Sequence, residues 1–203
     1  MTTFEFVGGA LSLDLANTVD WQGEEPVQSD RLGGYQDLLA WAEASGSLSR
    51  GDARLLRDSA AVDPSGAARA FRYAREVRSL IHRVATGHAR GQAPEPAVLE
   101  ALNRQLARVS RHMVIVPTST GFSRKWQATG RDYDRPVWPA LASVGDLLVS
   151  DDLKRLRECP GEKCGWLFVD RSRPGTRRWC DMRTCGNRAK ARRHYGRSAG
   201  VRS

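Results

Sequence analysis

The stretch Cys159–Gly196 reads CPGEKCGWLFVDRSRPGTRRWCDMRTCGNRAKARRHYG and holds every cysteine of the 203-residue chain. The cysteines follow the spacing C-x4-C-x15-C-x4-C and are Cys159, Cys164, Cys180 and Cys185. Each close pair fits one tight turn, and the insert between the pairs is long enough to bring the second turn back to the first. The spacing therefore predicts one tetrahedral zinc ion (Zn2+) per chain, bound by four thiolates.

Turn-forming, β-prone and basic residues alternate along this stretch and predict its local structure. Prolines and glycines around the first cysteine pair favour a knuckle, and we expect a hairpin of two strands, 166–169 and 176–179, to follow it. The second pair then forms another knuckle, after which residues 187–195 form a cationic helix that Gly196 ends. Knuckle, hairpin, knuckle and helix is the order of a treble-clef zinc finger, whose metal contributes folding free energy on the order of 10 kcal/mol.

Other roles for the four cysteines compete with structural zinc. An iron–sulfur cluster uses the same four thiolates, and reversible disulfides would make the cysteines a redox switch. Catalytic zinc is disfavoured, because four sulfur ligands leave no coordination position for water. Paired cysteines in a reducing compartment are more often metal ligands than disulfides, and the basic flanks are typical of zinc fingers, so structural zinc is preferred.

Positive charge is concentrated in the same part of the chain. The net charge is +9, yet residues 171–203 contain eleven basic residues and a single acid, Asp181. This tail therefore carries a charge of +10, and the remaining residues carry a charge of −1. A nearly neutral body with a strongly cationic tail indicates that the tail binds a polyanion.

The predicted terminal helix has the properties of a DNA-binding element. Arg188 and Arg192 align on one face, because residues four apart in a helix are neighbours. A helix of this size fits the major groove of DNA, where arginine can form two hydrogen bonds with guanine. Roughly five to eight phosphate contacts are feasible, which predicts a steep loss of affinity as salt rises. The candidate nucleic-acid-binding residues are Arg173, Arg177, Arg178, Arg183, Arg188, Lys190, Arg192, Arg193 and Arg197.

The chain is expected to have an α+β, mostly helical fold, with a helical domain with a small β element over 1–157 and the zinc finger over 158–203. Apolar residues recur every three or four positions through 64–89, which predicts the longest helix. Two β-prone runs, 113–116 and 122–126, flank a turn and predict a hairpin. Further helices are expected at 10–19, 37–44, 49–61, 97–108, 136–149 and 151–157, a strand at 4–7 and a polar loop at 24–29.

Asp14 and Asn17 are polar residues within an otherwise apolar predicted helix. They either line a ligand pocket for a small-molecule effector or tie the helix to its neighbours through hydrogen bonds. The sequence carries no motif typical of nucleotide binding, serine hydrolases or zinc proteases. A treble-clef nuclease also needs a histidine in the hairpin, and the predicted hairpin has none. We therefore do not expect an enzyme.

Composition points to a cytoplasmic protein. Hydrophobic residues make up 40% and charged residues 27% of the chain, which is ordinary for a globular protein. No run approaches the ~18 apolar residues of a membrane span, so no membrane partner is expected. The first residues carry acids and no basic segment, unlike a secretory signal.

Two parts of the sequence resemble known families. Residues 159–195, with Cys-Gly-Asn-Arg at 185–188, resemble the CGNR zinc-finger family, and FVGGALSLDLANTVDW at 6–21 resembles the start of the ABATE domain. The resemblance implies a mostly helical N-terminal domain with some β structure, followed by a treble-clef zinc finger. It also implies a bacterial protein of a group described as stress-induced transcription regulators, which favours DNA over RNA as the partner.

These observations predict a DNA-binding regulator whose finger contacts DNA and whose N-terminal domain senses a ligand or mediates assembly. A homodimer is expected, because one small finger rarely specifies a long site. Three alternatives remain open: a finger that binds RNA, an adaptor whose finger docks on an acidic protein, and an enzyme hidden in the N-terminal domain.

Overall fold

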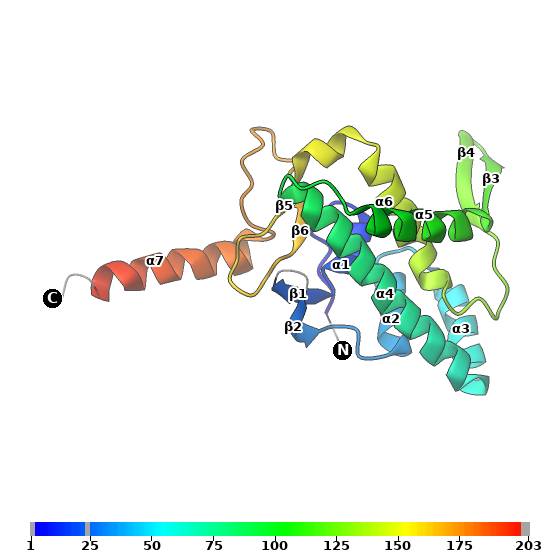
Figure 1. Cartoon of the computed structure of the whole chain (residues 1–203). Coiled ribbons are helices and arrows are strands. Elements are labelled where there is room, and N and C mark those ends of the chain that lie inside the picture. Colours follow the sequence, from blue (N-terminus) through cyan, green and yellow to red (C-terminus); the bar gives the residue numbers. More distant parts are fainter. Residues whose placement is uncertain (1–2, 23–24, 200–203) are drawn as a thin grey trace.

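The computed structural model describes residues 3–22 and 25–199, and their side chains except at 22–28 and 194–199 (Figure 1). In this part of the chain a helical body is followed by a small cysteine-containing region and a projecting helix, as the predicted fold class requires. The α-helices are α1 (Leu11–Ala16), α2 (Tyr35–Ala44), α3 (Arg50–Val62), α4 (Pro64–Ala89), α5 (Pro96–Ser110), α6 (Trp138–Leu148) and α7 (Asn187–Ala199).

The described strands form three separate antiparallel pairs, and each pair joins neighbours in sequence. These pairs are β1 (Val19–Gln22) with β2 (Glu25–Asp30), β3 (Met113–Thr118) with β4 (Gly121–Trp126), and β5 (Leu156–Glu158) with β6 (Leu167–Val169). Short helical turns complete the fold: η1 (Arg135–Val137) and η2 (Asp151–Arg155) are 3-10 helices, and η3 (Met182–Gly186) is a π-helical turn.

Helix α4 runs through the middle of the body, and the other body helices pack along it (Figure 1). Asp63 starts it by accepting a hydrogen bond from the backbone N–H of Gly66 at 2.8 Å, which satisfies a free donor of the first turn. Its apolar stripe, which includes Ile81, enters a core dominated by Trp41 and Trp138, both at most 1% exposed. The apolar pattern that predicted this helix is thus the pattern that its neighbours bury.

Most predicted helices are confirmed, and the 113–126 hairpin forms in the predicted place. Ser49 caps α3, because its Oγ accepts a hydrogen bond from Asp52 N at 3.1 Å. Local signals of this kind, namely a capping hydroxyl and a regular apolar stripe, act within a few residues. They could therefore be recognised without knowledge of the tertiary structure.

Several local predictions are wrong. Residues 4–7 form no strand, and residues 25–29 of the predicted loop belong to strand β2, while residue 24 lies outside the described residues. The first helix stops at Ala16, and β1 follows where the helix was expected to continue. The helix predicted over 151–157 is the short η2 followed by β5, because β5 pairs with β6.

Strand β5 lies at the predicted boundary between the two domains. The predicted boundary between residues 157 and 158 falls inside this strand, which pairs with β6 across the first cysteine knuckle. The start of the cysteine-containing region is therefore part of a hairpin that begins at Leu156. No helix in the described ranges is long and apolar enough to cross a membrane.

Candidate metal centre and nucleic-acid interface

The first cysteine knuckle closes the β5–β6 hairpin. The backbone N–H of Cys159 donates to Trp166 O at 2.7 Å and extends the pairing of the two strands to the first cysteine. Gly161 lies against the sulfurs: a Cβ there would be 2.9 Å from Cys185 Sγ and 3.4 Å from Cys159 Sγ. Only a glycine lets the backbone approach so closely, and this approach brings the second cysteine pair over the first.

The strand predicted at 176–179 is wrong. Residues 170–181 form no strand, and β6 takes its partner from β5, which precedes the first cysteine. Asp170 organises the connecting loop instead, because it is 1% exposed and its carboxylate accepts hydrogen bonds from the backbone N–H groups of Ser172 and Arg177, each at 2.9 Å. The region is zinc-finger-like, with a hairpin built around the first knuckle rather than between the two knuckles.

The second knuckle is the π-helical turn η3, which leads directly into α7. Asp181 caps the turn by accepting from the backbone N–H of Arg183, and Asn187 Nδ2 donates to Arg183 O at 3.2 Å. The predicted end of the helix at Gly196 is wrong, since α7 continues to Ala199. The last cysteine pair thus fixes the start of the cationic helix.

The four predicted metal ligands come together. Their sulfurs all lie within 4.8 Å of one another, and all four cysteines are buried. Cys180 Sγ is 3.6 Å from Cys164 Sγ and 3.7 Å from Cys185 Sγ. Sulfurs bound to one tetrahedral zinc ion at about 2.3 Å would lie about 3.8 Å apart, so the residues fit this ion.

The same clustering makes the site unfavourable without a cation. Hydrogen bonds from Cys164 and Cys180 hold the pKa of the Cys159 thiol well below its usual range. The hydrogen bond with Cys159 raises the pKa of Cys164 and of Cys180, and burial raises the pKa of Cys185. One thiolate therefore suppresses the ionisation of its neighbours, whereas a divalent ion would stabilise all four thiolates together.

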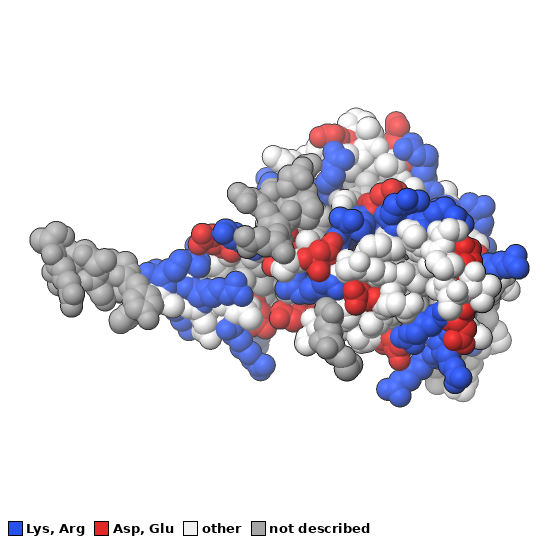
Figure 2. Space-filling model, turned by 90° about the horizontal axis from the view of Figure 1, so that it is seen from below, with Lys and Arg blue, Asp and Glu red and all other residues white. Residues whose placement is uncertain are grey.

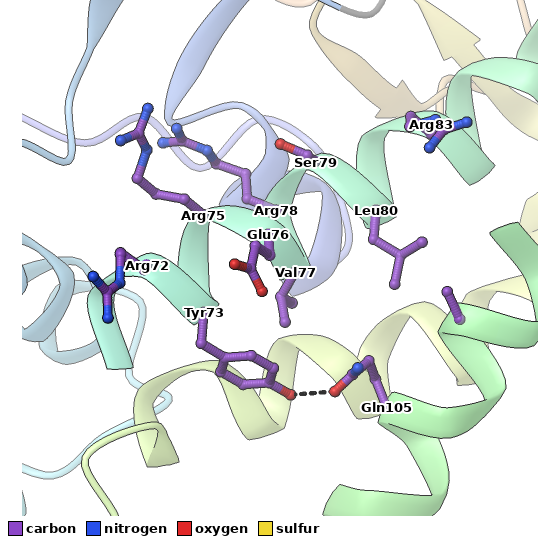
Figure 3. A pocket seen from close by; sticks show the side chains of 11 residues that line it. Arg72, Tyr73, Arg75, Glu76, Val77, Arg78, Ser79, Leu80, Arg83 and Gln105 are labelled. Atoms are coloured by element: carbon purple, nitrogen blue, oxygen red, sulfur yellow. Dashed lines mark hydrogen bonds between the residues drawn. The ribbon is translucent and has the colours of Figure 1, made fainter. Parts of the chain in front are cut away.

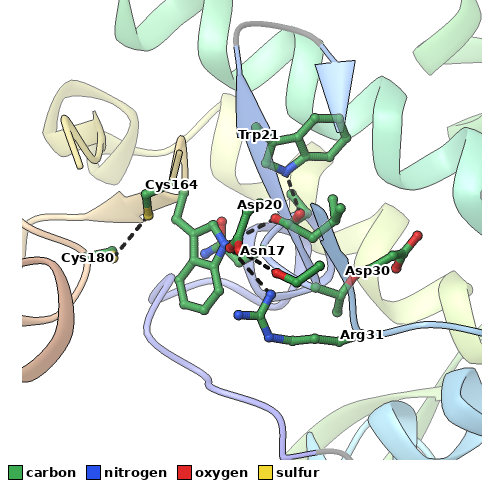
Figure 4. A network of polar contacts seen from close by, with 12 residues as sticks. Asn17, Asp20, Trp21, Asp30, Arg31, Cys164 and Cys180 are labelled. Atoms are coloured by element: carbon green, nitrogen blue, oxygen red, sulfur yellow. Dashed lines mark hydrogen bonds and ion pairs between the residues drawn. The ribbon is translucent and has the colours of Figure 1, made fainter. Parts of the chain in front are cut away.

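Two hydrogen bonds between the side chain of Asn17 and the backbone of Leu167 join the helical body to the finger. Asn17 Nδ2 donates to Leu167 O at 2.8 Å, and Leu167 N donates to Asn17 Oδ1 at 2.9 Å. Next to them, Trp21 N donates to Cys164 O at 2.9 Å, so the knuckle continues the edge of β1 (Figure 4). Asn17 therefore ties its helix to a neighbouring element through hydrogen bonds, which is one of the two roles that the sequence predicted for it.

An aromatic stack carries this contact to α4. The rings of Trp21 and His82 lie parallel, with centroids 3.8 Å apart, and His82 is fully buried. Burial lowers the pKa of His82 to about 4. Gly165 has φ +60, and a Cβ there would lie 2.8 Å from Trp21. Sequence reasoning missed His82, whose only signal was its place on the apolar stripe of its helix.

Most predicted nucleic-acid contacts lie on the surface, but Arg177 is engaged inside the finger. Its guanidinium donates to the carbonyls of Val7, Trp179 and Cys180, and stacks 4.3 Å from the centroid of Phe168. Arg178 is exposed and stacks on Trp179 at 5.6 Å. The other exposed members of the predicted set are Arg173, Arg183, Arg188, Lys190, Arg192 and Arg193, and the Arg197 side chain lies outside the described residues.

Helix α7 projects from the body as an arm (Figure 1), and basic side chains cover its described part (Figure 2). Ala189 is the one described residue of α7 that is buried, and it lies beside the knuckle. Glu162 of the first knuckle forms an ion pair with the arm: its carboxylate is 3.8 Å from the Arg192 guanidinium, and both side chains are about half exposed or more. Such an exposed ion pair contributes little to stability, so the cations of the arm stay available to a polyanion.

Several hollows lie away from the cysteines, and two of them bear on ligand binding. The larger of the two, about 610 Å³, follows α4 beside α5, and there Tyr73 Oη donates to Gln105 Oε1 at 2.7 Å (Figure 3). The smaller, about 410 Å³, includes Asp14 but not Asn17. The structure thus separates the two residues proposed for one ligand pocket.

Comparison with family models gives two matches that cover nearly the whole chain. Residues 9–151 match the ABATE model, described as "Putative stress-induced transcription regulator", and residues 155–198 match the CGNR zinc-finger model. A comparison with curated proteins gives no match. The second match and the four clustered thiols agree on zinc as the metal of this site. The chain therefore belongs to the ABATE family and carries a CGNR zinc finger after the ABATE domain.

Proposed function

We propose that this protein is a zinc-dependent DNA-binding transcription regulator that contacts DNA with α7. The observation that carries the proposal is the position of α7, which starts at the zinc knuckle and projects with its cations exposed. Zinc fixes the first turn of the helix, and the docked knuckle fixes its direction relative to the body. A rigid cationic helix presented in this way suits entry into the major groove and contact with phosphates.

The proposal assigns no catalysis to the zinc. All four thiols converge on one point, so four sulfur ligands would fill the coordination sphere and leave no position for water. The metal then has a structural task, which is to join the two cysteine knuckles. We place the protein in the cytoplasm and expect a homodimer, since two fingers would read two half-sites; sedimentation with and without DNA measures the dimer.

Replacing two arm cations tests the DNA interface. The double variant Arg192→Ala and Arg193→Ala should keep one zinc per chain and should bind duplex DNA more weakly. If both arginines contact phosphates, the slope of log affinity against log salt should become shallower by about 2. The matched control is Arg54→Ala with Arg72→Ala, which removes the same charge from exposed positions of α3 and α4. Equal slopes for the two double variants would contradict an interface on α7.

A further inference from the structure

A hollow of about 410 Å³ lies where the N-terminal segment passes the end of α2. Phe6, Leu11 and Ala44 give it apolar walls, and Ser45 is at its edge. The Ser45 hydroxyl already donates to Ala42 O at 3.0 Å. Asp14 is the single buried residue of the lining, with 9% of its surface exposed. The hollow is therefore a mostly apolar site with one carboxylate at its most buried point.

The Asp14 carboxylate is only half satisfied by the protein. Its Oδ1 accepts a hydrogen bond from Gly8 N at 2.8 Å, and its Oδ2 has no partner among the described residues. The described residues that line the hollow include no lysine or arginine. Burial raises the pKa of Asp14 to about 6, against the lowering effect of the Gly8 hydrogen bond. A buried carboxylate without a cation is costly, and a cation placed at Oδ2 would remove that cost.

In the larger hollow along α4 the most buried charged group is already paired with an acid. There the Arg78 guanidinium is 2% exposed and forms two hydrogen bonds with Asp30, at 2.6 and 2.7 Å. Its side chain points away from Tyr73, whose hydroxyl is engaged by Gln105 (Figure 3). The most buried charge of that hollow is thus neutralised by an acid of the protein, whereas the Asp14 carboxylate of the smaller hollow has no basic residue among the described residues that line it.

We propose that the Asp14 hollow binds a small organic ammonium ion with an apolar body. The ammonium group donates to Asp14 Oδ2, and the apolar body lies against Phe6, Leu11 and Ala44. An aromatic ring at the rim favours a cation further. A divalent metal ion fits less well, because it needs about six oxygen ligands and the side chains of the lining offer one carboxylate and one hydroxyl.

The hollow is connected to the finger through one residue, Gly8. Gly8 donates its N–H to Asp14 and accepts a hydrogen bond at its carbonyl from Val169 N, at 2.8 Å, in strand β6. A side chain at position 8 is excluded, since its Cβ would lie 2.7 Å from Leu13 Cβ. A ligand that holds Asp14 in place therefore also stabilises the attachment of β6, whether or not the finger binds DNA.

Calorimetric titration of the zinc-loaded full chain with benzylammonium, and with benzyl alcohol as its neutral counterpart, tests this proposal. We expect saturable binding of benzylammonium at least ten-fold tighter than that of benzyl alcohol. Slower hydrogen exchange of the Val169 amide should accompany it. Asp14→Asn keeps an oxygen acceptor for Gly8 and should fold and hold zinc, but it should bind the two compounds equally weakly.

The control is Asp151→Asn, which removes one carboxylate that is 94% exposed on η2 and should bind benzylammonium as the wild type does. Two results would overturn the proposal. One is benzylammonium binding that is unchanged in Asp14→Asn, and the other is no preference for benzylammonium over benzyl alcohol in the wild type. DNA binding enters neither measurement, so the outcome is independent of the proposed function.

Discussion

The helical body and the finger are stabilised in different ways. The body buries large apolar side chains, such as Trp41, Trp138 and Leu38, in one continuous core. The finger buries four cysteines with Trp166 and Phe168, and its cluster is completed by Val19 and Trp21 of the body. A core of the first kind forms from the chain alone, whereas the second kind needs both a metal ion and a docking surface.

This difference shows that the two family regions are one physical unit at their junction. The finger supplies the partner for Asn17 and Trp21, and the body supplies part of the apolar cover of the cysteines. Each side thus presents groups that would lack hydrogen-bond partners without the other. Loss of zinc should loosen β1 and the end of α1 as well as the finger, and leave the helices around Trp41 intact.

Removing one metal ligand should have the largest effect. Cys180→Ser leaves three thiols, so the finger should lose zinc and unfold. The folding free energy lost should be on the order of the 10 kcal/mol that structural zinc contributes. Hydrogen exchange should rise across the finger and β1 and stay slow in α4. Thr184→Ser, in the same turn, should keep its metal. Retained zinc with unchanged exchange in Cys180→Ser would show that the cysteines do not form the metal site.

Acid should weaken the junction through His82. Burial lowers its folded pKa to about 4, while the unfolded chain titrates near 6.5, so the unfolded state binds more protons between these values. This contribution to stability is complete above pH 6.5 and is lost as the pH falls towards 4, by about 3 kcal/mol.

The free energy of unfolding of wild type and His82→Phe, measured across this pH range, isolates the effect from acid release of zinc. The variant should lose less stability than the wild type as the pH falls. His88→Gln, an exposed histidine of the same helix, should behave like the wild type. Identical pH profiles for His82→Phe and wild type would mean that the buried ring has no role in acid sensitivity.

Cutting the Asn17 hydrogen bonds should have a smaller effect. Asn17→Ala removes two buried hydrogen bonds and leaves the backbone groups of Leu167 unpaired, which should cost about 2–4 kcal/mol. Zinc should stay bound, and exchange of the Leu167 amide should become faster. The exposed Asn103→Ala is the matched control. A finger amide that exchanges no faster in Asn17→Ala would rule out this contact as the attachment.

Whether a feature of this structure could be predicted from the sequence depends on how far apart along the chain the interacting residues lie. The Ser49 cap, the stripe of α4 and the four cysteines are set by neighbours or by metal chemistry, and were predictable. Strand β2 was missed because a polar segment with Pro26 becomes a strand only by pairing with β1.

The site itself was predicted in part for the same reason. Cysteine spacing identifies the four ligands, since no other residues of the chain share that chemistry. Charge alone cannot show which arginine turns inward, so Arg177 was grouped with the surface cations although it contacts Val7 and Phe168. These contacts join residues about 170 and nine positions apart, respectively, and only the folded chain brings them together.

Duplex DNA binding by the zinc-loaded and the metal-free protein, at two salt concentrations and with zinc assayed on each sample, shows whether zinc holds α7 ready for DNA. We expect one zinc per chain, affinity that falls steeply as salt rises, and loss of that affinity when zinc is removed. Zinc-loaded protein without salt-dependent affinity for DNA would contradict this expectation, as would equal affinity with and without the metal.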